Sequence, residues 1–188
     1  GDLLDPEDDA STAFRGGRAM LTLGFSRLGV EDAGAVDAQY PRLLAAYGAA
    51  SDVNTRLYPG AVDAVKRLIA EGYAVGICTN KPEALAQTLL ERLSVRELFA
   101  ALVGADTLPV RKPDPAPYVA AVERAGGVVA QSVLIGDTVT DRKTAQAAGV
   151  PVVLVTFGPD GDGVAALEPE ALLAHFDDLP RVVKELIG

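Results

Sequence analysis

Residues 132–155 read "SVLIGDTVTDRKTAQAAGVPVVLV", and this stretch decides the fold class. It begins with a short apolar run, turns polar at Asp137, continues through a polar run of helix-forming residues, and ends in a second apolar run. Short apolar runs on either side of a helix of about ten residues are typical of a strand–helix–strand unit with parallel strands. The stretch therefore predicts a strand over 132–137, a helix over 141–150 and a strand over 151–155.

The same alternation precedes this unit. Apolar runs at 73–78 and 101–106 alternate with helical patterns that begin near Ala61, Pro82 and Ala116. Because these runs are apolar on both faces, they indicate strands that are covered by helices on each side. We predict an α/β domain over residues 59–188, built on a doubly wound parallel sheet, and a final helical region over 168–187.

Residues 1–58 have a different pattern. Apolar side chains recur at helical intervals at Met20, Leu21, Phe25 and Leu28, and a second helical stretch follows over 32–47. Neither stretch contains the run of β-branched residues that favours a strand. We therefore predict a small all-helical domain over residues 1–58, followed by the α/β domain.

The composition restricts the possible partners. The chain has 188 residues, 49% of them hydrophobic, one cysteine and a formal net charge of −9. No apolar run reaches the roughly 20 residues of a membrane span, and no basic-then-apolar leader opens the chain. Nucleic-acid binding requires clustered lysines and arginines, and the sequence has no such stripe. We expect a cytoplasmic monomer or homodimer without a nucleic-acid or membrane partner.

Polar side chains follow three of the predicted strands, where parallel α/β sheets bind their ligands. Thr79 and Asn80 come directly after the apolar run that ends at Cys78, and Pro82 opens the next helix. A hydroxyl and an amide beside the free N–H groups of a helix N-terminus suit a phosphate or another oxyanion. The alternative is that Thr79 or Asn80 only caps the helix.

Lys112 lies in the proline-rich loop "RKPDPAP", residues 111–117. Prolines restrict the backbone, so this loop loses little further entropy when it is ordered. A rigid loop can hold one ammonium group in a fixed place, where it can act as a point charge for a phosphate. The alternative is a solvated lysine in a surface loop.

Asp137 and Asp141 follow the third strand. Two carboxylates so close together disfavour each other's ionisation unless a positive charge lies nearby. Mg²⁺ binds one or two protein carboxylates, several waters and a substrate phosphate oxygen, which suits this spacing. The alternative is that Asp141 caps a helix and Asp137 is a turn residue. The joint occurrence of a hydroxyl, a lysine and two acids at successive strand ends favours a phosphate site.

Three segments, in this order, resemble the haloacid dehalogenase superfamily of phosphatases with a helical cap, and above all its phosphoglycolate phosphatase type. They are "CTNKP" at 78–82, "GADTLPVRKPDPAP" at 104–117 and "LIGDTVTDRKTAQAAGVPVVLV" at 134–155, which match the family's second, third and fourth motifs. The resemblance implies that residues 1–58 form the cap and residues 59–188 the core.

The resemblance also implies a role for each polar residue. Thr79 and Lys112 would hold the transferring phosphoryl group, with help from Asn80. Asp137 would ligate Mg²⁺, and Asp141 would hold the waters of the metal or orient the lysine.

The cap of this family closes over the substrate. Arg15 and Arg18, in "RGGR", are the candidates there for binding the non-phosphate end of the substrate. The alternative for both residues is a solvated helix start.

The chain departs from the family at the first motif. That motif, DxDGT, carries the nucleophilic aspartate on a first core strand in the middle of the sheet, and it does not occur here. Without that strand, the predicted strands at 73–78 and 133–136 would face a gap with unpaired backbone groups. We expect the natural protein to contain the absent segment, and this chain to be inactive by itself.

The expected function of the full-length protein is Mg²⁺-dependent hydrolysis of a phosphomonoester through an aspartyl-phosphate. The expected substrate is a small phosphorylated metabolite such as 2-phosphoglycolate. Three alternatives stay open at this point: a dehalogenase of the same fold, a sugar-phosphate mutase, and a non-catalytic relative that binds a phosphate ligand.

Overall fold

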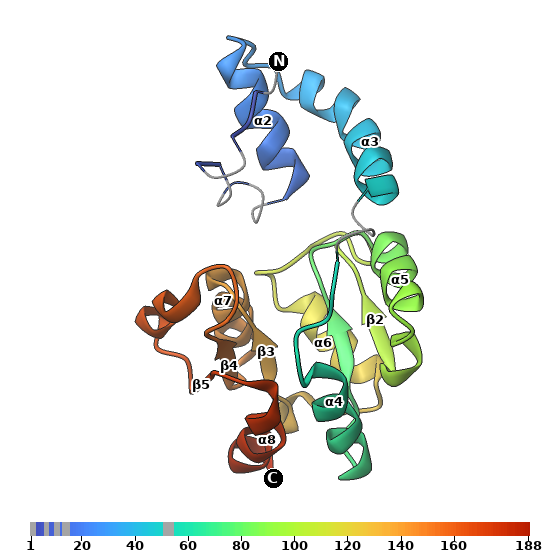
Figure 1. Cartoon of the computed structure of the whole chain (residues 1–188), viewed down its shortest axis with the longest axis vertical. Coiled ribbons are helices and arrows are strands. Elements are labelled where there is room, and N and C mark those ends of the chain that lie inside the picture. Colours follow the sequence, from blue (N-terminus) through green and yellow to red (C-terminus); the bar gives the residue numbers. More distant parts are fainter. Residues whose placement is uncertain (1–2, 6–7, 10–11, 13–15, 51–54) are drawn as a thin grey trace. The chain divides into compact units, whose positions relative to one another are not determined.

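The computed structural model describes residues 3–5, 8, 9, 12, 16–50 and 55–188. The chain divides into two compact units, residues 1–55 and 56–188 (Figure 1). The first unit contains helices α2 (Gly17–Arg27) and α3 (Ala33–Ala50), which pack against each other. Its described residues contain no strand, so the prediction of helices in this segment is confirmed.

The second unit alternates strands and helices. The strands are β1 (Gly76–Cys78), β2 (Ala101–Val103), β3 (Leu134–Gly136), β4 (Val152–Val155) and β5 (Ala171–Leu173). The α-helices are α4 (Ala61–Ala70), α5 (Glu83–Arg92), α6 (Ala116–Arg124), α7 (Val139–Ala148) and α8 (Leu179–Ile187). Four short 3₁₀ helices complete the unit: η1 (Arg96–Leu98), η2 (Val129–Gln131), η3 (Gly161–Leu167) and η4 (Phe176–Asp178).

The strands form two parallel sheets. β1 pairs with β2, and β4 pairs with β3 on one side and with β5 on the other. In the described part of the chain, β1 and β3 share no ladder, so each of them has only one strand partner. The sheet is therefore divided at the position where the sequence predicts a gap.

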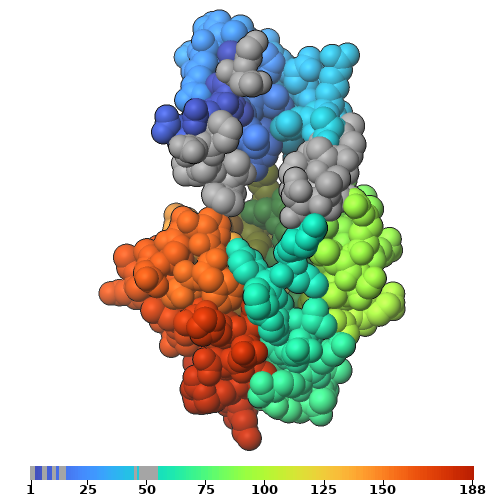
Figure 2. Space-filling view, in the orientation of Figure 1, coloured from blue at the N-terminus to red at the C-terminus, as the bar shows by residue number. Residues whose placement is uncertain are grey.

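Apolar side chains hold the two sheets together in one unit. Figure 1 shows α4 and α8 on the near side of the strands and α6 on the far side. One buried cluster combines Leu68 of α4 with Val153 of β4 and Val182 of α8, and a second cluster combines Tyr118 of α6 with Leu134 of β3. Helices thus cover both faces, which confirms the predicted α/β fold. The space-filling view shows the α4 segment in teal-green beside the orange-to-red C-terminal part (Figure 2).

The outer edge of β4 is closed by a strand that the sequence reading missed. The predicted helix over 168–187 is wrong in its first half, because residues 171–173 form β5, and helix α8 begins only at Leu179. Ala and Leu favour helices when they are considered alone. Here they are extended because they pair with β4, with Val153 opposite Ala171.

A carboxylate next to β5 reinforces this edge. Glu170 accepts the backbone N–H of Val152 at 2.8 Å and both its oxygens bind Arg142 of α7, at 2.9 and 3.0 Å. These bonds tie the β4–β5 edge to α7.

Among the described helices, none is long and apolar enough to cross a membrane.

Candidate functional site

The site lies at the carboxyl ends of β1, β2 and β3. Thr79 directly follows β1, and its backbone N–H donates to the carbonyl of Val103 at 2.9 Å, which extends the β1–β2 pairing by one step. The Thr79 hydroxyl accepts the N–H of Lys81 at 3.1 Å and so shapes the turn before α5. The side chain therefore sits in a turn at the strand end with its hydroxyl proton available for another acceptor.

Asn80 and Lys112 connect the loops that follow β1 and β2. The Asn80 Nδ2 group donates to the backbone carbonyl of Lys112 at 3.0 Å. The Lys112 ammonium reaches the first turn of helix α7, after β3 of the other sheet, where its Nζ lies 2.7 Å from Oδ1 of Asp141. The Lys112 side chain is only 12% exposed and that of Asp141 only 6%. The lysine is therefore held in a fixed place rather than solvated.

The carboxylate of Asp141 is fully occupied by hydrogen bonds. While Oδ1 binds Lys112, Oδ2 accepts the N–H of Asp137 at 3.1 Å, the N–H of Thr138 at 3.1 Å and the hydroxyl of Thr138 at 3.0 Å. Gly136 makes this arrangement possible, because a Cβ at that position would lie 2.4 Å from Cβ and Cγ of Asp141. Asp141 thus joins the end of β3, the start of α7 and the loop of Lys112.

Helix α7 begins earlier than predicted. It starts at Val139 rather than at residue 141, because Thr138 and Asp141 form a capping box around its first turn. The capping alternative for Asp141 is therefore part of the structure, and it coexists with the ion pair to Lys112. The pattern Thr-x-x-Asp at 138–141 was the signal for this cap, and Thr138 is the site residue that the sequence reading overlooked.

The two aspartates have pKa values that shift in opposite directions. Burial and the neighbouring charge of Asp141 raise the pKa of Asp137, although Lys112 acts in the opposite sense. Burial also opposes the ionisation of Asp141, but the charge of Lys112 and the donated hydrogen bonds outweigh it and hold the pKa of Asp141 below its ordinary value. Asp141 is therefore the more readily ionised carboxylate of the pair, and a cation near Asp137 would favour the charged form of Asp137.

These residues fit a divalent cation at Asp137. A buried carboxylate with a raised pKa becomes more favourable in its charged form when a cation binds it. Asp141 has no such need, because Lys112 and three other donors already surround its oxygens. Among the described residues, no group of three or more His, Cys, Asp or Glu side chains is arranged to hold a metal. A site with one direct carboxylate suits Mg²⁺, which retains waters and binds substrate oxygens.

A further acidic residue, Asp160, lies near Asp137. Asp160 directly precedes η3 and Asp162 lies in the first turn of η3, and both are exposed. The charge of Asp160 contributes to the raised pKa of Asp137, so the loop after β4 belongs to the electrostatic surroundings of the site. Neither Asp160 nor Asp162 was predicted as a site residue.

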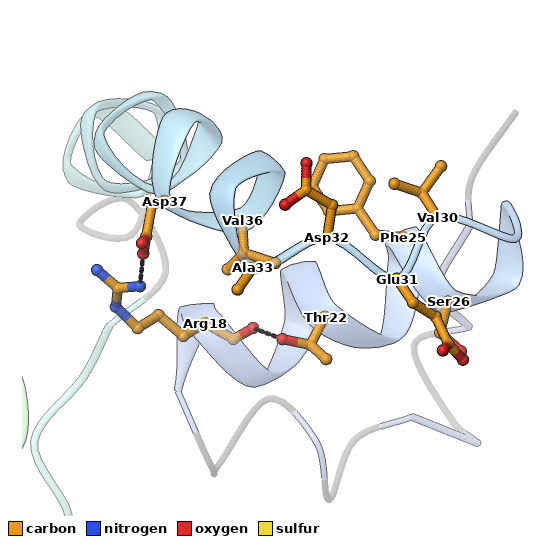
Figure 3. Close-up of a pocket in the computed structure, with 10 residues that line it drawn as sticks. All are labelled: Arg18, Thr22, Phe25, Ser26, Val30, Glu31, Asp32, Ala33, Val36 and Asp37. Atoms are coloured by element: carbon orange, nitrogen blue, oxygen red, sulfur yellow. Dashed lines mark hydrogen bonds and ion pairs between the residues drawn. The ribbon is translucent and has the colours of Figure 1, made fainter.

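The helical unit has a groove of its own, with a volume of about 590 Å³ between α2 and α3 (Figure 3). Arg18 lines it, and its guanidinium points to Asp37, with which it forms an ion pair, and lies 4.4 Å from the centre of the Tyr40 ring. Arg15 lies outside the described residues. Of the predicted site residues, hydrogen bonds connect Asn80, Lys112, Asp141 and Asp137. Thr79 precedes Asn80 in the same turn, and Arg18 lies in the other unit.

The sequence of this chain is similar to known proteins over most of its length. A family model described as haloacid dehalogenase-like hydrolase matches residues 23–155. The chain is 42% identical over 161 residues to a phosphoglycolate phosphatase of Rhodospirillum rubrum, covering 86% of this chain and 66% of the relative. It is 35% identical over 176 residues to a phosphoglycolate phosphatase of Agrobacterium fabrum, covering 93% of this chain and 76% of the relative.

A solved structure is also similar to this chain. The crystal structure of a protein described as a predicted phosphoglycolate phosphatase from Haemophilus somnus superposes with a TM-score of 0.77 and 25% sequence identity, covering 89% of this chain and 77% of that one. The chain spans 66% of the Rhodospirillum relative and 55% of a phosphoglycolate phosphatase of Mesorhizobium japonicum, to which it is 44% identical over 125 residues. On these matches, and on the strand-end residues that carry them, the chain belongs to the haloacid dehalogenase-like hydrolase family.

Proposed function

We propose that the full-length protein is a Mg²⁺-dependent phosphomonoester hydrolase that acts on a small phosphorylated metabolite such as 2-phosphoglycolate. The observation that carries this proposal is the buried ion pair between Lys112 and Asp141, which joins the carboxyl-end loops of the two sheets. It holds one ammonium group in the loop to which Asn80 is also bonded. The names of the Rhodospirillum and Agrobacterium relatives supply the substrate class.

Three residues of the site would take part in binding the phosphate. The Lys112 ammonium has three N–H donors, so its bond to Asp141 leaves donors for phosphate oxygens. The Thr79 hydroxyl accepts from Lys81 and retains its own proton to donate. Asn80 binds the Lys112 backbone and holds the lysine loop beside Thr79. Positively charged and neutral donors fixed in this way stabilise the charge that develops on a transferring phosphoryl group.

Asp137 would hold the Mg²⁺ ion. Bound there, the metal supplies positive charge that polarises the phosphate and offsets its negative charge. Asp141 then acts by orienting Lys112 and by closing the turn of residues 136–138, rather than as a direct ligand. Of the two roles that the family resemblance allows for Asp141, its four hydrogen bonds favour the orientation of the lysine.

We assign the nucleophile to an aspartate on a further strand that would lie between β1 and β3. Three observations support this assignment: both strands are paired on one side only among the described residues, the chain spans 66% or less of two of its relatives, and DxDGT does not occur. A carboxylate oxygen would attack phosphorus, the ester P–O bond would break, and the alcohol would leave with a proton from a general acid. Water would then hydrolyse the acyl phosphate and restore the carboxylate.

A substrate screen of the full-length gene product tests the proposal. With Mg²⁺, we expect hydrolysis of small phosphomonoesters including 2-phosphoglycolate, and loss of that activity in Lys112→Ala and Asp137→Asn. Activity that survives both substitutions would refute the assignment of the site. Binding of phosphate without hydrolysis by the full-length protein would show a non-catalytic relative instead. An intact mass of the native gene product equal to the 19.5 kDa of this chain would refute the additional strand.

In the helical unit we propose Arg18 for contact with the non-phosphate end of the substrate, and Arg15 stays a prediction beside it. Since Arg18 already pairs with Asp37, an anionic substrate group would compete with that carboxylate. Arg18→Met should raise KM and leave kcat nearly unchanged, whereas Arg42→Met, an exposed arginine of α3, should change neither. Equal kinetics of the Arg18 variant and the wild type would exclude this role.

A further inference from the structure

We propose that Asp106 and Thr107 are positioning residues that fix the phosphate-binding turn from the neighbouring strand. We call residues 79–83, from the end of β1 to the first residue of α5, the phosphate turn, and residues 104–107, directly after β2, the clamp loop. The inference rests on the proposed function, because Thr79 and Asn80 in the phosphate turn are assigned to phosphate binding there. It adds two residues to the site that the motif residues alone leave out.

The clamp loop continues the pairing of β1 and β2 beyond the ends of both strands. The Thr79 N–H donates to Val103 at 2.9 Å, and two residues later the Ala105 N–H donates to the carbonyl of Lys81 at 3.0 Å. The backbones therefore stay in register while the chain leaves the sheet. Backbone hydrogen bonds to the clamp loop therefore hold the phosphate turn in position, as they hold neighbouring strands in a sheet.

Asp106 caps helix α5 from the clamp loop. The residue before the helix is Pro82, which has no side-chain hydrogen bond to the first turn. The N–H of Glu83, the first residue of α5, donates instead to Oδ1 of Asp106 at 2.7 Å. A carboxylate at this position satisfies a free N–H group and interacts favourably with the helix dipole. The junction of phosphate turn and helix is thus fixed by a residue 23 positions away.

Thr107 fixes the same junction through its hydroxyl. Its Oγ1 accepts the N–H of Gly104 at 2.7 Å and donates to Oε2 of Glu83. Glu83 is therefore bound at its backbone by Asp106 and at its side chain by Thr107. Gly104 allows the two segments to approach this closely, because a Cβ there would lie 2.4 Å from N and 2.5 Å from Cα of Glu83.

This arrangement changes which groups are available to an anion. The N–H of Glu83 would be one of the free donors at the start of α5, but it is committed to Asp106. Phosphate at this end of the site would then be bound by the Thr79 hydroxyl, Asn80 and Lys112. The precision of these contacts depends on how firmly the clamp loop holds the phosphate turn.

Four variants of the full-length protein test the inference. Asp106→Ala and Thr107→Val remove the clamp, whereas Asp106→Asn and Thr107→Ser retain an acceptor or a hydroxyl. Inorganic phosphate binding in the presence of Mg²⁺ is measured by calorimetry, kcat and KM with 2-phosphoglycolate are determined, and amide hydrogen exchange is followed at residues 79–83. Glu170→Ala is the matched control, because Glu170 also accepts a backbone N–H through its carboxylate, at the β4–β5 edge.

We expect Asp106→Ala and Thr107→Val to accelerate exchange in the phosphate turn and to weaken phosphate binding by about tenfold or more, since small displacements of positioning groups have large effects. The two conservative variants should stay within about threefold of the wild type. The inference alone would be overturned if phosphate affinity and KM are unchanged, or if affinity falls and KM rises no more than in Glu170→Ala. A wild type that neither binds phosphate nor hydrolyses phosphomonoesters would refute the proposed function, and the inference with it.

Discussion

Removing the carboxylate of Asp141 should destabilise the α/β unit more than removing the ammonium of Lys112, although the two groups form one ion pair. Lys112→Met removes one charge-assisted hydrogen bond and leaves Asp141 with three donors, at a cost of about 1.5–3 kcal/mol. Asp141→Ala leaves a buried lysine without its partner, which costs about 3–5 kcal/mol. It also leaves the N–H groups of Asp137 and Thr138 and the Thr138 hydroxyl without their acceptor. The loss of stability should therefore be clearly larger for Asp141→Ala than for Lys112→Met.

The assay is equilibrium unfolding in urea, followed by circular dichroism, of the wild type, both single variants and the double variant. In the double variant the lysine is no longer unpaired, so the two losses should not add. We expect a coupling energy of about 1–3 kcal/mol. If Lys112→Met costs as much as Asp141→Ala, or if the two losses add, then Asp141 is not the shared acceptor that the structure shows.

The same pair predicts a pH dependence. The pKa of Asp141 lies below its ordinary value of 3.8 in the folded protein, so the unfolded chain takes up its proton first as the pH falls. The stability from this carboxylate is therefore fully present above about pH 4 and is lost as the pH falls through the folded pKa. The difference in stability between the wild type and Lys112→Met should shrink over this acid range. A difference that stays constant from neutral pH down to unfolding in acid would contradict the lowered pKa.

Three further substitutions test the surroundings of the pair. Because the pKa of Asp137 is raised, its ionised form destabilises the folded protein at neutral pH. Asp137→Asn should therefore raise the Tm measured in EDTA and abolish any rise in Tm on adding Mg²⁺. A lower Tm in EDTA would contradict this. Gly136→Ala places a Cβ against Asp141 and should cost about 1–3 kcal/mol in urea unfolding, whereas Gly163→Ala, with open space around it, should be nearly neutral. Thr138→Val should cost about 1 kcal/mol through loss of the cap and Thr138→Ser much less, which thermal unfolding would show; equal losses would exclude a role for the hydroxyl.

Much of the α/β unit could be predicted from the sequence because its central strands are buried on both faces. Residues 152–155 are all apolar and all buried, so composition and structure agree there. β5 could not be recognised in the same way, since "ALL" at 171–173 is extended only through its pairing with β4. The separation of β1 from β3 could be anticipated, because the absence of one motif implied the absence of one strand.

The residues of the candidate site could be predicted, whereas their partners could not. Thr79 and Asp137 each follow an apolar run, and that position alone marks the end of a parallel strand. The bond from Lys112 to Asp141 joins residues 29 positions apart, and the bond from Asp106 to Glu83 joins residues 23 positions apart. Such contacts depend on how strands and loops meet in three dimensions, and no local pattern records them.

The edge strand β5 has a consequence for synthesis of the protein. A chain that folds as it leaves the ribosome forms its N-terminal parts first, but the buried cluster around Val153 includes Leu173 and Val182, which are made late. Until these residues emerge, β4 presents an open, apolar edge to the surrounding solution, and such edges recruit other chains. Translation that stops before Ala171 should therefore yield aggregates rather than a shortened soluble unit, even though every residue of the candidate site would already be present.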